Sequence, residues 1–278
     1  MSLDAIYHAL DPIAFSVGPF SVRWYGIAYV LGFVLGAVVV WRTQRRWHLN
    51  LTLDDLLTLM IGIALGVIIG GRLGYCLFYG DGYYLAHPLH ILMTFEGGMS
   101  FHGGLIGGIL GGWISCKFTG LSPRTMLDLG LMAAPLGLFF GRCANFVNGE
   151  LWGKPTDLPW GVTFETGGGI ARHPSQLYEA LLEGVVIFIV LQLLSRKRPA
   201  PPQGLITGTF LVLYGVFRIL IEFVRVPDIQ LGYLVGFLTM GQLLSIPLIL
   251  AGLIEIALAL KRQWPQSGYV PGREPYEN

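Results

Sequence analysis

The sequence predicts an all-α integral membrane protein with seven transmembrane helices, an extracytoplasmic N-terminus and a cytoplasmic C-terminus. Hydrophobic residues make up 53% of the 278 residues, and charged residues make up 13%, which is about half the share found in a soluble domain. The mean hydropathy is +0.61. Apolar stretches of about 20 residues recur along the chain. Basic residues gather in alternate connections between these stretches, and this alternation predicts the direction of each span.

Seven segments are long and apolar enough to cross a bilayer as helices. They cover residues 20–41, 54–78, 98–118, 126–147, 175–195, 204–224 and 236–260. We therefore expect a single polytopic membrane domain over residues 1–278, with a small extracytoplasmic excursion around 148–174 and a cytoplasmic C-terminal tail from about residue 261. Residues 1–19 contain two aspartates and no basic start before a continuous apolar run, so we do not expect a cleaved signal peptide.

The basic residues predict which ends of the spans face the cytoplasm. Eleven of the eighteen Lys and Arg residues fall in connections on one side. They are Arg42, Arg45, Arg46, Lys117, Arg124, Arg196, Lys197, Arg198, Lys261, Arg262 and Arg273. The opposite connections hold few basic residues, and residues 79–97 contain none. Because short cytoplasmic connections are enriched in Lys and Arg, the N-terminus is predicted outside and the C-terminus inside.

Glycine spacing predicts close helix packing along the second and third spans. In both spans, glycines or glycine pairs recur at every fourth residue. The positions are Gly62, Gly66, Gly70 and Gly74, then Gly103, Gly104, Gly107, Gly108, Gly111 and Gly112. Small residues at this spacing give a smooth ridge on which another helix can approach closely in lipid. No strand is predicted before these stretches, so a glycine loop that cradles phosphate is not expected.

Polar residues are predicted to gather near the extracytoplasmic ends of several spans, although they come from distant parts of the chain. The direction of each span places seven of them there: Tyr25, Arg72, His102, Arg142, Asn145, Arg218 and Glu222. A charged residue at the centre of a membrane helix costs roughly 2.5–3.5 kcal/mol on insertion scales. Such residues therefore face the interior of the bundle or a wet cavity, and they often mark function.

One polar stripe runs along the sixth predicted helix. At about 100° per residue, its members fall within about 80° of one another. They are Thr207, Tyr214, Arg218, Glu222 and Arg225. The structural alternative is that Arg218 and Glu222, at positions i and i+4, form an ion pair without any functional role.

Several arginines at one depth favour a ligand that carries a phosphate group. Arginine is always charged, and its planar guanidinium can bind two oxygens at once. The predicted site opens toward the outer leaflet, so the expected ligand is an anionic phospholipid. The extracytoplasmic connections are short and poor in Lys and Arg, which disfavours a soluble phosphorylated substrate.

Neither a disulfide framework nor a metal site is predicted. The three cysteines, Cys76, Cys116 and Cys143, lie in apolar stretches without CxxC spacing. His102 and His173 have no ligand-like spacing.

Five stretches of the sequence together resemble one enzyme family. The stretch GRCANFVNGELWG at 141–153 closely resembles the signature of bacterial prolipoprotein diacylglyceryl transferases. Four more are similar to the same family, in order along the chain: VRWYGIAY at 22–29, FHGGLIGG at 101–108, RHPSQLYEALLEG at 172–184 and YGVFRILIEFVRVPD at 214–228. The resemblance covers nearly the whole chain. Ala144 departs from the commonest form of the signature, which has glycine there.

The resemblance implies an enzyme that acts on a membrane lipid. Members of the family move the diacylglyceryl group of phosphatidylglycerol onto the lipobox cysteine thiol of a preprolipoprotein signal peptide. A thioether forms and glycerol phosphate is released, which is the first step of lipoprotein maturation. The implied partners are phosphatidylglycerol, the preprolipoprotein and membrane lipid, with no nucleic acid, no cofactor and no metal. The implied location is the bacterial cytoplasmic (inner) membrane.

The resemblance also implies roles for individual residues. His102, Arg142 and Arg218 are expected to be catalytic, with His102 as the base for the thiol and the two arginines on the lipid phosphate. An imidazole can accept a proton at neutral pH. The expected substrate-binding residues are Tyr25, Asn145, Glu150, Gly153, Tyr214 and Glu222, with Glu150 orienting Arg142.

Some of these residues also have a structural alternative. His102 could merely order the glycine-rich start of its helix. Tyr25 and Tyr214 could be aromatic anchors at the membrane interface. His173, which precedes Pro174, could cap the fifth helix.

Two other classes of function agree less well with the sequence. A transporter or scramblase for anionic lipid needs polar groups in the inner half of the membrane, where the sequence offers Asp128, Glu183, Gln192 and a few hydroxyls. An intramembrane protease would use Ser100 or Ser175 with a histidine, but neither serine lies in a nucleophile-elbow context.

Overall fold

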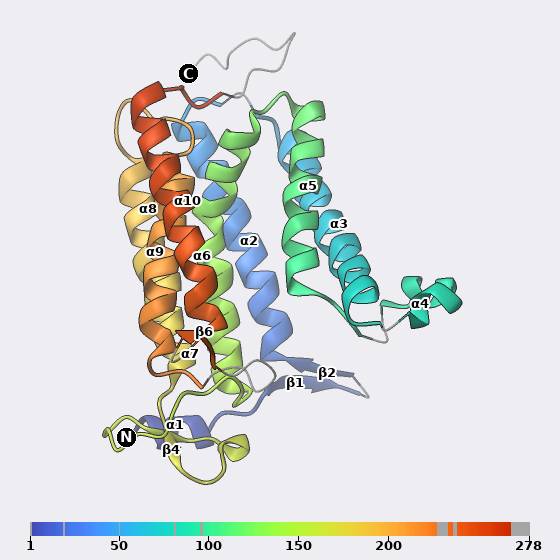
Figure 1. Cartoon of the computed structure of the whole chain (residues 1–278), viewed down its shortest axis with the longest axis vertical. Coiled ribbons are helices and arrows are strands. Elements are labelled where there is room, and N and C mark those ends of the chain that lie inside the picture. The colour runs from blue at the N-terminus through green and yellow to red at the C-terminus, as the bar shows by residue number, and fades with distance from the viewer. Residues whose placement is uncertain are drawn as a thin grey trace. The chain divides into compact units, whose positions relative to one another are not determined.

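The computed structural model is mainly helical (Figure 1). It describes residues 2–18, 20–49, 51–80, 82–94, 97–226, 233–235 and 238–267. Most of the predicted cytoplasmic tail, including Arg273, lies outside the described residues. The contacts divide the chain into two compact units: the first comprises residues 1–43 and 128–265, and the second comprises residues 44–127 and 266–278. The single polytopic domain expected from the sequence stays a prediction.

Within the described chain, six helices are long and apolar enough to cross a membrane. They are α2 (Trp24–Arg46), α3 (Leu53–Phe78), α6 (Pro123–Val147), the continuous helix Ser175–Ser195, α9 (Leu205–Glu222) and α10 (Met240–Arg262). The prediction of a mostly helical, multi-pass membrane protein agrees with these six helices.

The third predicted span, residues 98–118, forms helix α5 (Phe101–Thr119), which is not among the six. Six glycines, together with His102 and Lys117, lower the mean hydropathy of α5, although the helix has 19 residues. The seventh span and the direction of the two termini therefore stay predictions.

Helices α9 and α10 lie side by side in the first unit (Figure 1). Their backbones come close together where Gly208 faces Gly252. A Cβ atom on Gly208 would lie only 2.7 Å from the Gly252 carbonyl oxygen. Helices α2 and α6 approach each other at Gly32 and Gly137, where a Cβ atom on Gly32 would lie 3.3 Å from the Gly137 Cα. These contacts use small residues, as is typical of helices that pack in lipid.

The helix Ser175–Ser195 changes its winding in the middle. It begins as α7 (Ser175–Glu179), continues as the π-helical segment η4 (Ala180–Val186) and ends as α8 (Ile187–Ser195). A Cβ atom on Gly184 would lie 2.7 Å from the Cβ of Phe139, so η4 packs tightly on α6. π-helical turns are frequent at functional sites.

The expectation of an all-α chain missed several short elements outside the long helices. The first unit contains α1 (Leu3–His8), η3 (Glu165–Gly167) and the antiparallel pairs β1–β2 (Ile13–Val17, Phe20–Arg23), β3–β4 (Val162–Thr163, Ala171–Arg172) and β5–β6 (Tyr233–Val235, Leu238–Thr239). Strands of two to five residues are too short to give a clear hydrophobic period.

The second unit is built on the pair α3 and α5, which pack along a seam of glycines (Figure 1). A Cβ atom on Gly66 would lie 2.1 Å from the Gly107 carbonyl oxygen, and one on Gly70 would lie 2.3 Å from the Gly103 carbonyl oxygen. The close packing predicted from the glycine spacing is therefore confirmed. The short helices α4 (Tyr83–Ala86) and η1 (Pro88–Leu92) lie in the connection between the two long helices.

Asp128 of α6 caps the start of α9 in the first unit. Its side chain is fully buried. Oδ2 accepts a hydrogen bond from the Gly204 amide at 2.8 Å, and Oδ1 accepts bonds from the Thr207 amide at 2.9 Å and from its hydroxyl at 2.6 Å. A carboxylate at a helix N-terminus satisfies backbone donors and interacts favourably with the helix dipole. Thr207, which was predicted to lie on one polar stripe with Arg218 and Glu222, binds Asp128 at the start of this helix.

Replacing Asp128 with Ala is expected to lower the free energy of unfolding by about 2–4 kcal/mol, because three donors lose one charged acceptor. Denaturant unfolding of the purified protein, followed by circular dichroism, measures this change. Thr207→Val removes only the hydroxyl bond and is expected to cost about 1 kcal/mol. Equal stability of the two variants would contradict the cap.

Candidate functional site

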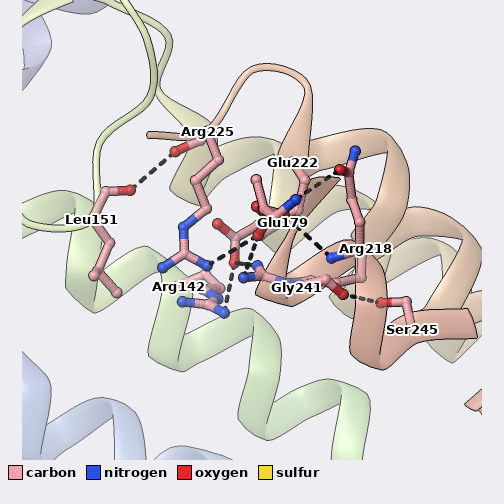
Figure 2. A network of polar contacts seen from close by, with 11 residues as sticks. Arg142, Leu151, Glu179, Arg218, Glu222, Arg225, Gly241 and Ser245 are labelled. Atoms are coloured by element: carbon pink, nitrogen blue, oxygen red, sulfur yellow. Dashed lines mark hydrogen bonds and ion pairs between the residues drawn. The ribbon is translucent and has the colours of Figure 1, made fainter. Parts of the chain in front are cut away.

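Three arginines of the first unit converge on two carboxylates (Figure 2). Arg142 of α6 places Nη2 2.6 Å from Oε2 of Glu179 on α7, and Arg218 of α9 places Nη1 3.4 Å from the same oxygen. The Nη2 of Arg218 lies 2.6 Å from Oε1 of Glu222, and the Nη1 of Arg225 lies 3.9 Å from that oxygen. We call these five residues the arginine cluster. They come from three separate segments of the chain.

Glu222 is held from a second side by the start of α10. Its Oε2 accepts a hydrogen bond from the Thr239 hydroxyl at 2.7 Å. Thr239 is also the N-cap of α10, where it forms a capping box with Gln242. Gly241 leaves room for this contact, since a Cβ atom there would lie 2.5 Å from Oε1 of Glu222. Glu222, the partner of Arg218, is therefore held in place by the start of α10.

The arginine cluster has more positive than negative groups. Within the arginine cluster, three guanidinium groups pair with the two carboxylates of Glu179 and Glu222, so these five residues carry one surplus positive charge. Burial lowers the pKa of Arg225 from its ordinary value, because a charged guanidinium loses its hydration there. Charged groups buried at membrane depth are costly and commonly mark a functional site. The arrangement can hold one anionic group.

A third carboxyl group, Glu183 of η4, lies close enough to interact electrostatically with Arg142, Arg218 and Arg225. Glu179 and Glu183 are both 0% exposed. Neither oxygen of Glu183 has a hydrogen-bond partner among the described residues. Burying an unpaired carboxyl group is unfavourable, and the nearby arginines offset part of this cost.

Glu150 does not orient Arg142 in the way the sequence suggested. The carboxylate paired with Arg142 is that of Glu179. Oε1 of Glu150 instead accepts hydrogen bonds from Nδ2 of Asn145 at 2.7 Å and from Nδ2 of Asn148 at 3.3 Å. Asn145 and Glu150 therefore form a polar pair of their own at the end of α6.

The turn after α6 is held by the first residues of α7. Nε2 of Gln176 donates a hydrogen bond to the Glu150 carbonyl at 2.6 Å, and the Ser175 hydroxyl donates one to the Leu151 carbonyl at 3.0 Å. Leu151 adopts the left-handed conformation with φ 59°, which is uncommon for a leucine. These bonds fix the peptide groups on both sides of the strained residue.

Gly153 is needed because two backbones pass close to it. Its amide donates a hydrogen bond to the His173 carbonyl at 2.9 Å, and it forms a bridge with Arg225. A Cβ atom on Gly153 would lie 2.6 Å from the Val224 carbonyl oxygen and 2.7 Å from the Cβ of His173. Gly153 thus connects the excursion to the chain segment that carries Arg225. Its predicted part in substrate binding stays a prediction.

His173 does not cap the fifth helix. The N-cap residue is Pro174, which makes no side-chain cap bond. Nδ1 of His173 lies 3.2 Å from the Tyr178 hydroxyl, which also accepts a hydrogen bond from Nε1 of Trp160 at 2.7 Å. Burial lowers the pKa of His173, since the charged imidazolium loses hydration.

The two tyrosines predicted at the site lie in different surroundings. Tyr214 of α9 interacts electrostatically with Glu183 and Arg218, and its ring stacks on Phe210 with centroids 5.7 Å apart. Tyr25 of α2 is exposed, and its hydroxyl lies 3.1 Å from that of Tyr29. Tyr25 also interacts electrostatically with Glu150 and Arg142. Both tyrosines therefore lie near charges of the candidate site.

Two predicted residues belong to the second unit. His102 is the second residue of α5, and its side chain is exposed. Arg72 of α3 is buried among backbone carbonyl groups and is no member of the arginine cluster. The role of His102 as the base for the thiol stays a prediction.

Sequence reasoning missed Glu179 as the partner of Arg142 and Arg218. Glu179 and Glu183 are spaced i, i+4 in an otherwise apolar helix, so both fall on one face. Carboxylates with this spacing inside a span are rare, and that signal was available. Among the described residues, no group of three or more His, Cys, Asp or Glu side chains could hold a metal ion.

Residues 12–258 match the family described as prolipoprotein diacylglyceryl transferase. The chain is 49% identical over 254 residues to the phosphatidylglycerol–prolipoprotein diacylglyceryl transferase of Geobacter sulfurreducens, covering 91% of this chain and 97% of that protein. It is 50% identical over 253 residues to the protein of the same name from Nitratidesulfovibrio vulgaris, covering 88% and 92%. A third protein of that name, from Pseudomonas syringae, is 46% identical over 260 residues, covering 92% and 96%.

Proposed function

Since the chain belongs to the prolipoprotein diacylglyceryl transferase family, we propose that its arginine cluster holds the phosphate of phosphatidylglycerol during transfer. The enzyme transfers the diacylglyceryl group of this lipid to a prolipoprotein, in the first step of lipoprotein maturation. The observation that supports the proposal most is the surplus positive charge of Arg142, Arg218 and Arg225 over Glu179 and Glu222. A phosphate diester carries a negative charge, and guanidinium groups that outnumber their paired carboxylates can bind it.

The chemistry increases the negative charge on the phosphate. The sulfur of the prolipoprotein cysteine attacks the glycerol carbon that bears the phosphate ester, a carbon–sulfur bond forms, and the carbon–oxygen bond to phosphate breaks. The bonding electrons leave with glycerol phosphate, and the thiol proton passes to a base. Cations placed in advance stabilise this growing charge without reorganising.

Arg142 and Arg218 can bind phosphate while they keep their carboxylate partners. A guanidinium group has five N–H donors, and these contacts use only part of them: Arg142 contacts one carboxylate oxygen and Arg218 contacts two. Glu179 and Glu222 then orient the two arginines, as second partners do in many anion sites. In this arrangement Asn145 and Glu150 bind headgroup oxygens, and Tyr25 and Tyr214 close the pocket. The acceptor of the thiol proton is His102.

The membrane arrangement belongs to the same proposal. Seven spans, with α5 as the third, would place the N-terminus outside and the C-terminus in the cytoplasm. The ends of α6 and α9 that carry Arg142 and Arg218 would then lie in the outer leaflet of the inner membrane. The lipobox cysteine of a secreted signal peptide is accessible from that side.

The direct test uses the purified protein in lipid nanodiscs with phosphatidylglycerol and a lipobox peptide. Mass spectrometry is expected to show the peptide gaining a diacylglyceryl group as glycerol phosphate appears. A peptide with serine in place of the cysteine, and nanodiscs of phosphatidylethanolamine alone, serve as controls and are expected to give no product. A folded protein that forms no thioether from phosphatidylglycerol would disprove the function.

A further inference from the structure

Arg72 of α3 lies in a cage of backbone carbonyl groups within the second unit. The residue is only 3% exposed. Nε donates a hydrogen bond to the Ile91 carbonyl at 2.8 Å, and Nη2 donates one to the His90 carbonyl. Nη1 donates to the carbonyls of Gly97 and Gly98. One guanidinium group therefore binds four carbonyl oxygens of the connection between α3 and α5.

The ring of Tyr84 in α4 contributes a further contact to this cage. The guanidinium carbon of Arg72 lies 5.2 Å from the ring centroid, within the range of a cation–π interaction. None of these five contacts is with a carboxylate. Burying a charged guanidinium costs more than burying a neutral amide. The cage nevertheless requires arginine, because only a guanidinium offers five N–H donors in one plane to the four carbonyl groups.

The two glycines in the cage have a conformation that brings their carbonyl groups to the same donor. Gly97 has φ 85° and Gly98 has φ 80°, which is the left-handed region that other residues avoid. A Cβ atom on Gly98 would also lie 2.5 Å from the ring of Tyr75. The shape of the segment 97–98 is therefore specific to glycine and matched to Arg72.

The caged segment leads directly into the start of α5. The Ser100 amide donates a hydrogen bond to the Gly71 carbonyl, next to Arg72, at 2.8 Å. Ser100 is the N-cap of α5, and its hydroxyl accepts a bond from the Gly103 amide at 3.3 Å. His102 lies between these two residues. The backbone at His102 is thus held by contacts to Gly71 and Arg72 on one side and by the helix on the other.

We propose that Arg72 is a positioning residue for the transfer reaction, because the carbonyl cage around its guanidinium fixes segment 97–100 and so holds His102 in one orientation. This inference rests on the proposed role of His102 as the base for the thiol. It goes beyond that role because it assigns the orientation of the base to a residue that contacts no substrate. Small errors in the placement of a reacting group reduce turnover without weakening substrate binding.

The first test is Arg72→Lys. Lysine keeps the charge, but its three rotatable donors cannot bind four carbonyls in one plane. We expect kcat to fall about 10- to 100-fold with KM for phosphatidylglycerol unchanged. Tyr84→Phe, which keeps the aromatic ring over the guanidinium, is the matched control and is expected to have wild-type kinetics.

A double-mutant cycle separates positioning of His102 from other effects. In a His102→Asn background, Arg72→Lys is expected to cause little further loss, because the positioned base is already absent. If the wild type is active and Arg72→Lys lowers kcat by the same factor in both backgrounds, the positioning role of Arg72 is disproved while the proposed function stands. A folded wild type without transferase activity would overturn the proposed function.

Hydrogen exchange provides a readout that needs no turnover. Arg72→Lys is expected to increase amide exchange at least tenfold over residues 97–104, while residues 105–118 of α5 stay at wild-type rates. Unchanged exchange over residues 97–104 would overturn the proposal even if kcat falls. The same experiment with Tyr84→Phe is expected to show no difference from wild type.

Discussion

Replacing Arg142 with Ala is expected to reduce kcat/KM for diacylglyceryl transfer by about 100-fold or more, with the protein still inserted in the membrane. The guanidinium of Arg142 lies 2.6 Å from Glu179, and its loss removes the surplus positive charge of the arginine cluster. The leaving phosphate then gains negative charge with one cation fewer beside it. Loss of one preorganised donor to a developing anion typically costs a factor of about 10² to 10³ in rate.

Arg142→Ala also leaves Glu179 with Arg218 as its remaining partner, at 3.4 Å. A buried carboxylate that loses a partner destabilises the fold, so activity has to be read together with stability. The double variant Arg142→Ala with Glu179→Gln removes the unpaired charge and is expected to recover stability but not activity. Recovery of both would show that Arg142 serves only the fold.

The assay is initial-rate thioether formation, with thermal unfolding measured on the same preparations. Arg142→Lys keeps the charge without the planar fork and is expected to retain a small fraction of the activity. Arg196→Ala removes an exposed arginine at the end of α8 and is the matched control, with wild-type rates expected. Arg142→Ala with wild-type kcat/KM would remove Arg142 from the phosphate site.

The long helices could be predicted from the sequence because each one repeats a single physical requirement over many residues. An apolar stretch of about 20 residues has few structures available to it in lipid, since every backbone polar group must be paired internally. The seam between α3 and α5 was predictable for a similar reason, because the four-residue spacing of glycines marks one helix face. Both signals are local and do not depend on other parts of the chain.

The partners of the polar residues could be predicted only in part. Helical phase places Arg218 and Glu222 on one face of α9, and the structure pairs them at 2.6 Å. Phase also places Thr207 on that face, yet Thr207 binds Asp128 at the other end of the helix. Glu179, the shared partner of Arg142 and Arg218, belongs to another helix. Such pairings depend on how the helices are arranged in space, and the residue pattern of a single helix does not determine that arrangement.

The second large effect is expected in the second unit, where Gly107→Ala should lower the free energy of unfolding by about 3 kcal/mol. A Cβ atom on Gly107 would lie 2.0 Å from the Gly66 carbonyl oxygen and 2.9 Å from the Gly70 Cα. Both are backbone atoms, so neither can turn away as a side chain would. The two helices must separate along the seam, and each contact between them weakens.

Gly104→Ala is the matched control, three residues earlier in the same helix. The nearest atom to its added Cβ, the Val67 carbonyl oxygen, lies at 3.5 Å, which is ordinary van der Waals contact. Alanine favours a helix over glycine by about 1 kcal/mol at either position, so propensity alone predicts that both variants gain stability. Denaturant unfolding in identical nanodiscs compares them. The close backbone approach at Gly107 predicts that Gly107→Ala lowers the free energy of unfolding while Gly104→Ala raises it. Equal stability of the two variants would show that α3 and α5 do not meet along this seam.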